Sequence, residues 1–94
     1  MKEYVYAIYG YLLDIDLYFR GRDEETILLI HEMKKAVDRY IKNPSKTTFE
    51  PIYKLKDGFY EDGKIKNKYV SVQAQVNNLD EMIFRTKKEL YKFN

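Results

Sequence analysis

Residues 65–93 read IKNKYVSVQAQVNNLDEMIFRTKKELYKF. Apolar side chains recur along this stretch at alternating steps of four and three, and only Thr86 interrupts them. The apolar members of this C-terminal seam are Ile65, Tyr69, Val72, Val76, Leu79, Ile83, Leu90 and Phe93. Such spacing forms a stripe along one side of a helix, and a second helix must cover that stripe. The stretch therefore predicts helix packing, and it does not itself indicate any chemistry.

A second helix is predicted over residues 23–42, where one face is apolar and the opposite face is charged. Its apolar face consists of Thr26, Leu29, Ile30, Met33, Ala36, Val37 and Tyr40. Gly21 can end a preceding helix, Asp23 can cap this one, and the Asn43-Pro44 pair stops it. The ends of this helix are thus marked as clearly as its face.

Residues 3–20 fit two patterns. A heptad stripe predicts a helix, and its members are Tyr4, Ile8, Tyr11, Ile15 and Tyr18, with Val5, Leu12 and Phe19 beside them. A strand or hairpin bent at Gly10 is the rival interpretation, because apolar side chains also alternate from Val5 to Phe19 and tyrosine favours strands. As a helix, the segment is apolar on most sides and belongs in the middle of a bundle or in a subunit interface.

Residues 44–68 are rich in turn signals. Thr47 and Glu50 have capping-box spacing, Pro51 is tolerated in a first turn, and Gly58 can stop a helix. These signals predict a short helix over about residues 48–57. The alternative is a hairpin around Asp62-Gly63 with a last strand containing Val70, Val72, Ala74 and Val76, followed by a helix capped by Asn78.

The preferred fold is an all-α bundle, because one long helix accounts for the whole C-terminal seam. It comprises a helical hairpin (3–20 and 23–42), a short helix (about 48–57) and a long C-terminal helix (about 66–92). The alternative is an α+β fold with a hairpin within residues 51–76 and helices at 23–42 and 79–93. At 94 residues, the chain is expected to form a single domain, 1–94.

Composition and charge argue against nucleic-acid-binding, exported and membrane-spanning proteins. The net charge is only +2, but residues 1–32 hold three basic and seven acidic side chains, and the remainder carries +6. This imbalance is weaker than the basic stripe of most nucleic-acid modules. The chain has no cysteine, no apolar run of membrane-spanning length, and an acidic Glu3 where a signal peptide would be basic. We therefore expect a cytoplasmic protein without a membrane span.

Candidate catalytic groups lack partners in the sequence. His31 is the only histidine, lies on the charged helix face and is not part of an HExxH motif. Asp14 and Asp16 would share a face only in a strand, since on a helix they diverge by about 200°. The four glycines are isolated from one another, so no phosphate-binding loop is formed. We expect no enzyme activity, no cofactor and no metal.

Aromatic side chains favour a protein partner, because tyrosine combines a large rigid contact area with a polar tip. The first helix and the exposed part of the seam are the expected contact surface, for a different protein or for a second copy of this chain. The candidate partner-binding residues are Tyr4, Tyr11, Tyr18, Phe19, Phe84 and Tyr91. Small inhibitors, immunity proteins, antitoxins and phage or plasmid accessory proteins are the classes that act in this way.

The alternative function is an RNA- or single-strand-binding module that uses the loop 53–69. Lysines there could hold phosphates while bases stack on aromatic rings. The candidate contact residues are Lys54, Lys56, Phe59, Tyr60, Lys64, Lys66 and Lys68. Three acids, Asp57, Glu61 and Asp62, dilute this positive charge, so nucleic acid ranks behind a protein partner.

Overall fold

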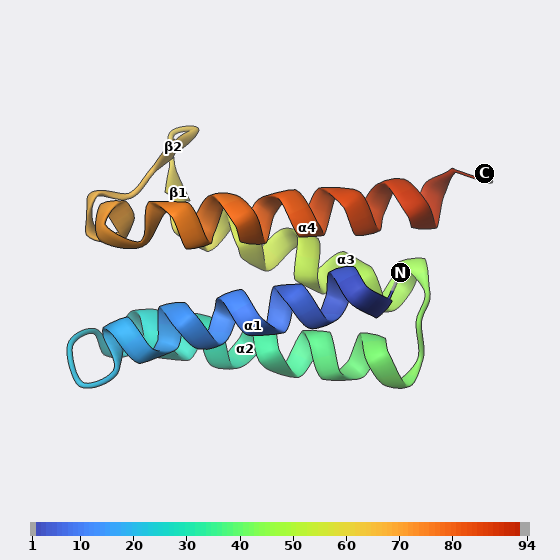
Figure 1. Cartoon of the computed structure of the whole chain (residues 1–94), viewed down its shortest axis with the longest axis horizontal. Coiled ribbons are helices and arrows are strands. Elements are labelled where there is room, and N and C mark those ends of the chain that lie inside the picture. The colour runs from blue at the N-terminus through green and yellow to red at the C-terminus, as the bar shows by residue number, and fades with distance from the viewer. Residues whose placement is uncertain (1, 93–94) are drawn as a thin grey trace.

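Four α-helices make up most of the computed structural model, which describes residues 2–92 (Figure 1). They are α1 (Lys2–Phe19), α2 (Glu24–Lys42), α3 (Lys46–Leu55) and α4 (Gln73–Tyr91). Between α3 and α4 lie a 3₁₀ helix η1 (Lys56–Phe59), short strands β1 (Tyr60–Glu61) and β2 (Lys64–Ile65), and a second 3₁₀ helix η2 (Asn67–Val72). The predicted all-α fold is confirmed, and the α+β alternative is wrong.

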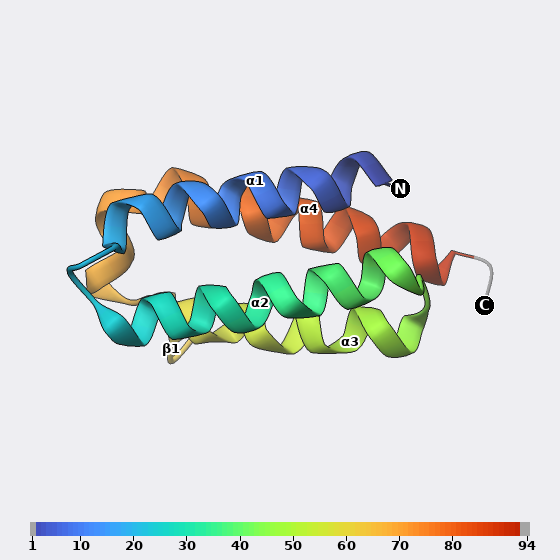
Figure 2. The same cartoon turned by 90° about the horizontal axis from the view of Figure 1, so that it is seen from below.

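The helices form a ring in which each is antiparallel to the next (Figures 1 and 2). α1 packs against α2 and α4, and α3 completes the ring between α2 and α4. The core is made of apolar side chains from all four helices and the connecting segment. It contains Val5, Ile8, Leu12, Ile15, Phe19, Ile30, Met33, Ala36, Val37, Tyr40, Phe49, Ile52, Phe59, Tyr69, Val72, Val76, Leu79 and Ile83.

Residues 4–19 are helical, so the strand interpretation of this segment is wrong. The buried side chains of α1 follow steps of three and four, and they are Val5, Ile8, Leu12, Ile15 and Phe19. The three tyrosines of the heptad stripe lie beside this buried seam: Tyr4 and Tyr11 are half-buried, and Tyr18 is exposed. Gly21 then turns the chain into α2 with a φ of +78°, a conformation that favours glycine.

The start of α3 differs from the prediction. The capping box is formed by Ser45 and Thr48, which exchange hydrogen bonds between side chain and backbone at 3.2 and 3.1 Å. The expected pair, Thr47 and Glu50, does not cap the helix, because α3 already begins at Lys46. Pro51 therefore lies two residues further into the helix than predicted.

The segment after α3 combines parts of both predictions. Asp62 and Gly63 have φ values of 54° and 79°, which suit a type I′ hairpin turn, and they join β1 to β2. The predicted strand at residues 70–76 is wrong, because η2 and the first turn of α4 occupy it. α4 begins at Gln73 and not near residue 66, since the chain first passes through η2, which still buries Tyr69 and Val72.

Candidate functional site

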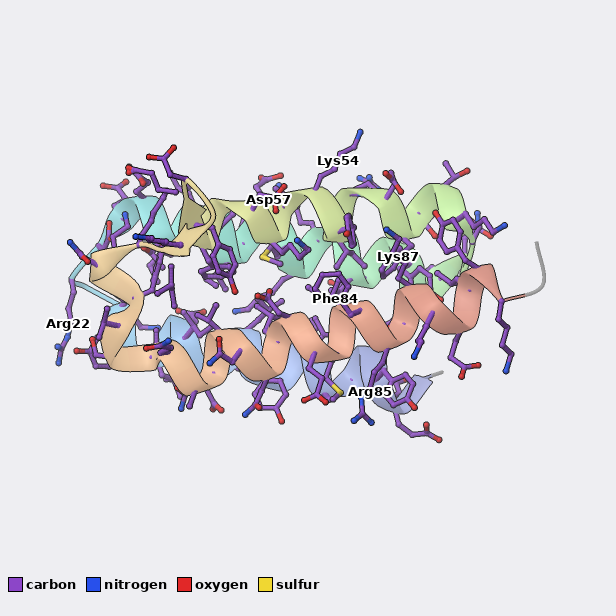
Figure 3. The ribbon with its side chains drawn as sticks, turned by 90° about the horizontal axis from the view of Figure 1, so that it is seen from above. Arg22, Lys54, Asp57, Phe84, Arg85 and Lys87 are labelled. Atoms are coloured by element: carbon purple, nitrogen blue, oxygen red, sulfur yellow. The ribbon has the colours of Figure 1, made fainter. Side chains whose placement is uncertain are left out.

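A cluster of lysines and aromatic rings lies where α3 faces α4. The Tyr53 ring of α3 packs edge-on against the Phe84 ring of α4, with 5.8 Å between centroids. The ammonium groups of Lys87 and Lys56 lie 4.0 and 4.6 Å from the Tyr53 centroid. Figure 3 shows Phe84 and Lys87 on the side of α4 that faces α3, and Arg85 on the other side. We define the lysine–aromatic face as Lys46, Tyr53, Lys56, Phe84, Lys87 and Tyr91.

Tyr91 extends this face toward the start of α3. The Lys46 ammonium lies 4.7 Å from the Tyr91 centroid, and that of Lys87 lies 6.0 Å from it. An ammonium group over a tyrosine ring contributes about 0.5–1 kcal/mol at an exposed site, so these contacts hold the side chains in place without removing their charge. Lys87 forms no ion pair within residues 2–92. The Lys56 ammonium, by contrast, also lies 3.1 Å from the carboxylate of the exposed Asp57, so the face offers the Lys87 charge in full and the Lys56 charge in part.

Asp80 lies at the edge of the lysine–aromatic face, in a hollow of about 440 Å³ lined also by Lys56, Tyr60 and Phe84. The Tyr60 hydroxyl donates a hydrogen bond to Asp80 Oδ2, whereas the buried Oδ1 has no partner among the described residues. Burial raises the pKa of the Asp80 carboxyl, although the Tyr60 hydroxyl and the Lys56 charge act in the opposite direction. The pKa of the Tyr60 hydroxyl is raised as well, mainly by burial and further by the Asp80 carboxylate.

We expect Asp80→Asn to stabilise the protein by about 1 kcal/mol near neutral pH, because the asparagine avoids burying a charge and still accepts from Tyr60. Because the folded-state pKa of Asp80 is raised, the wild-type protein gains stability as this carboxyl is protonated at low pH. The stability advantage of Asp80→Asn over wild type should therefore disappear in acid. Thermal unfolding of wild type and Asp80→Asn, measured near neutral pH and in acid, tests this prediction. Glu81→Gln is the matched control, because Glu81 is the exposed neighbouring residue and losing its surface ion pair with Arg85 should change stability little. A destabilised Asp80→Asn near neutral pH would contradict the assignment.

The six predicted partner-binding residues separate into different places. Phe84 and Tyr91 belong to the lysine–aromatic face, whereas the half-buried Tyr4 ring lies 6.0 Å from the Arg85 guanidinium. Tyr11 is half-buried, and the exposed Tyr18 ring lies 4.9 Å from the Arg22 guanidinium.

Phe19 is a core residue whose ring packs against Tyr69 at 5.5 Å, so burial removes it from any contact surface. The C-terminal seam is likewise turned inward: its members from Tyr69 to Thr86 are buried and Leu90 is half-buried. The seam therefore has no fully exposed part between Tyr69 and Leu90, contrary to the prediction, and Phe93 lies outside the described residues.

The loop 53–69 does not present its predicted residues as one surface. Phe59 is fully buried, and the Tyr60 hydroxyl is engaged by Asp80. Lys68 is held between Asp23 and Glu25 at 3.1 and 3.0 Å. Lys56 belongs to the lysine–aromatic face. The remaining lysines are separate: Lys54 points outward from α3 in Figure 3, Lys64 is exposed on β2, and Lys66 is half-buried.

The residues considered for catalysis do not converge. His31 is exposed on α2, and Asp14 is exposed on α1. Asp16 points instead toward α2, where its carboxylate lies 2.7 Å from Lys34 Nζ. Within residues 2–92 no three His, Asp or Glu side chains are grouped as metal ligands. No helix in the same range is long and apolar enough to cross a membrane.

Sequence reasoning missed Lys87 and Asp80, and it considered Tyr53 only as part of the loop 53–69. Part of the signal was present, because four residues of α4 repeat the seam spacing one position later along the helix. This second stripe consists of Asp80, Phe84, Lys87 and Tyr91. A stripe beside a buried seam lies at the border between two packed helices, which is where a groove forms. Comparisons with protein-family models, curated proteins and solved structures found no match to this chain.

Proposed function

We propose that this is a non-catalytic intracellular protein that binds an acidic surface of a protein partner through the lysine–aromatic face. The observation that carries the proposal is the Tyr53 ring held between α3 and α4 with two lysine ammonium groups within 5 Å of its centroid. In this role the chain acts by occupying its partner, as a small inhibitor, immunity protein, antitoxin or phage or plasmid accessory protein does.

Charge and shape support a protein partner. Residues 33–94 carry a net charge of +6, and the aromatic rings of the face add apolar contact area between the lysines. Aromatic residues surrounded by polar ones dominate the energetics of protein interfaces, and opposite charge on the partner accelerates association. Phe84 is 48% exposed, which makes it the natural apolar anchor of the contact.

Nucleic acid is less well supported, because stacking needs free aromatic faces. Lysine ammonium groups already lie over Tyr53 and Tyr91, and Phe59 is inside the core. The absence of catalysis is supported by the placement of the acids: Asp16 is engaged by Lys34, and His31 stands apart on α2. Both alternatives remain outcomes of the following experiment.

We expect wild-type protein, used as bait in its native host with and without nuclease, to enrich one acidic protein. The double variant Lys56→Glu/Lys87→Glu should lose at least about tenfold in affinity for it, because close opposite charges at interfaces couple strongly. Lys35→Glu/Lys42→Glu is the control, since it makes the same charge change on the exposed face of α2. Purified-component titration at two salt concentrations gives the affinities.

Three outcomes would overturn the proposal. The enriched material could be RNA and vanish with nuclease, which would favour the nucleic-acid alternative. The control variant could weaken binding as much as the face variant, which would place the contact elsewhere. Enrichment of a small-molecule substrate turned over by the wild-type chain would show an enzyme.

A further inference from the structure

The outer face of α1 carries large apolar side chains that the bundle leaves uncovered. Tyr6, Leu13 and Leu17 are 58%, 41% and 65% exposed, and Gly10 lies between them on the same face. Figure 2 shows α1 at the edge of the bundle, with α2 and α4 as its neighbours. This face belongs to neither the core nor the lysine–aromatic face, so it calls for a separate explanation.

The spacing of this face is that of a coiled-coil seam. Its members follow steps of three and four along the whole helix, on the side opposite the buried seam of α1. We define the outer seam as Glu3, Tyr6, Gly10, Leu13, Leu17 and Arg20. α1 therefore has two helix-packing seams, and the four-helix bundle covers one of them.

The outer seam is complementary to itself when a second copy runs antiparallel. In that arrangement Tyr6 lies opposite the other copy's Leu17, and Gly10 lies opposite its Leu13, since the residue numbers of each pair add up to 23. The small residue is thereby matched with a large one. A Cβ placed on Gly10 would have no atom within 4 Å outside its own helix backbone and adjacent residues, so there is open space for the leucine.

Charge favours the antiparallel direction. The same register places Glu3 opposite the other copy's Arg20 at both ends of the contact, while Arg20 keeps its own contact of 3.5 Å with Asp16. A parallel pair would instead bring Glu3 near Glu3 and Arg20 near Arg20, and it would leave a gap where two Gly10 residues meet. Opposite charges at the ends of helical seams set orientation in coiled coils even though each pair contributes little energy.

We propose that two copies of this chain form a two-fold symmetric dimer through the antiparallel outer seams of α1. A two-fold contact uses the same surface on both copies, as this register does. α1 has 18 residues and is therefore about 27 Å long. One helix from each copy makes a contact at or below the small end of stable interfaces, which bury about 1,200–2,000 Å², so the dimer should dissociate at micromolar concentrations. The lysine–aromatic face of each copy remains open.

Light scattering after size exclusion tests the dimer over a range of concentrations. The wild-type chain should approach twice its mass of 11.4 kDa. Leu17→Glu should raise the dissociation constant at least about tenfold, because it places an unpaired charge in the contact. Leu28→Glu, a change at a leucine of α2 that is 59% exposed, should leave the dimer intact. A wild-type monomer at about 1 mM protein, or equal effects of both variants, would overturn the proposal.

Cross-linking tests the register, because the chain contains no cysteine. A mixture of Tyr6→Cys and Leu17→Cys chains should form a mixed disulfide under mild oxidation. Either variant alone should not, since its two cysteines would be about 16 Å apart along the helices. Efficient cross-linking of each variant with itself would show a parallel pair and overturn the assignment. Neither test involves the lysine–aromatic face, so the two proposals can fail separately.

Discussion

Phe59→Ala is expected to lower the free energy of unfolding by about 3–5 kcal/mol. Phe59 is fully buried, and its ring lies 5.0 Å from that of Tyr69, which in turn packs against Phe19. These three rings tie η1 and η2 to α1. Because a small domain has a total stability of only about 5–15 kcal/mol, the variant should be partly unfolded near physiological temperature.

Phe84→Ala is the matched control for this prediction, since it makes the same truncation at an exposed ring. Its cost in stability should stay below about 1 kcal/mol. Urea unfolding followed by circular dichroism measures both. In binding assays the order should reverse: Phe84→Ala should weaken partner capture while keeping the fold. Similar stability losses in the two variants would mean that the core does not centre on Phe59 and Tyr69.

Asp16→Asn is expected to destabilise the protein by about 2 kcal/mol near neutral pH, as is typical of hydrogen bonds to charged groups. The Asp16 carboxylate is nearly buried at the contact between α1 and α2. It accepts a hydrogen bond from Lys34 Nζ at 2.7 Å, and Arg20 Nε lies 3.5 Å away. The Lys34 hydrogen bond, joined by Arg20, holds the pKa of Asp16 below its ordinary value of 3.8.

The stability difference between wild type and Asp16→Asn should depend on pH. A depressed folded-state pKa contributes stability above the ordinary value of 3.8, and that contribution is lost as the pH falls through the folded pKa. The difference between wild type and Asp16→Asn should therefore vanish in strong acid. Asp14→Asn, two residues away on the exposed side of α1, should change stability little at either pH. A pH-independent difference for Asp16→Asn would exclude the ion pair as its cause.

The fold could be predicted from periodicity, because the buried positions of each helix recur at regular spacing over many residues. The residues at which the helices begin could not be predicted in this way. A 3₁₀ turn and an α-turn bury nearly the same residues, so the C-terminal seam is equally consistent with a start near residue 66 or at Gln73. Likewise, Ser45 and Thr47 both precede suitable capping partners, and only the packed structure selects Ser45.

The candidate site was predictable only in part. Phe84 and Tyr91 stood out as aromatic residues beside the seam, but Tyr53 joins them only because α3 turns that ring toward α4. The sequence predicts Phe19 and Phe59 on binding surfaces, because the aromatic residue type alone does not distinguish a core residue from an interface anchor. Asp80 has no sequence signal of its own, because its surroundings depend on the hairpin that brings the Tyr60 hydroxyl to it.

The ring arrangement of the helices has a consequence for the order of folding. α1 to α3 each contact the next helix along the chain, so these contacts close short loops and form quickly. The packing of α1 on α4 instead joins the first and last helices, and it carries the larger entropy cost of loop closure. During synthesis, α1 is made before α4, so this contact can form only after α4 has been made. We therefore expect closure of this pair to limit the folding rate.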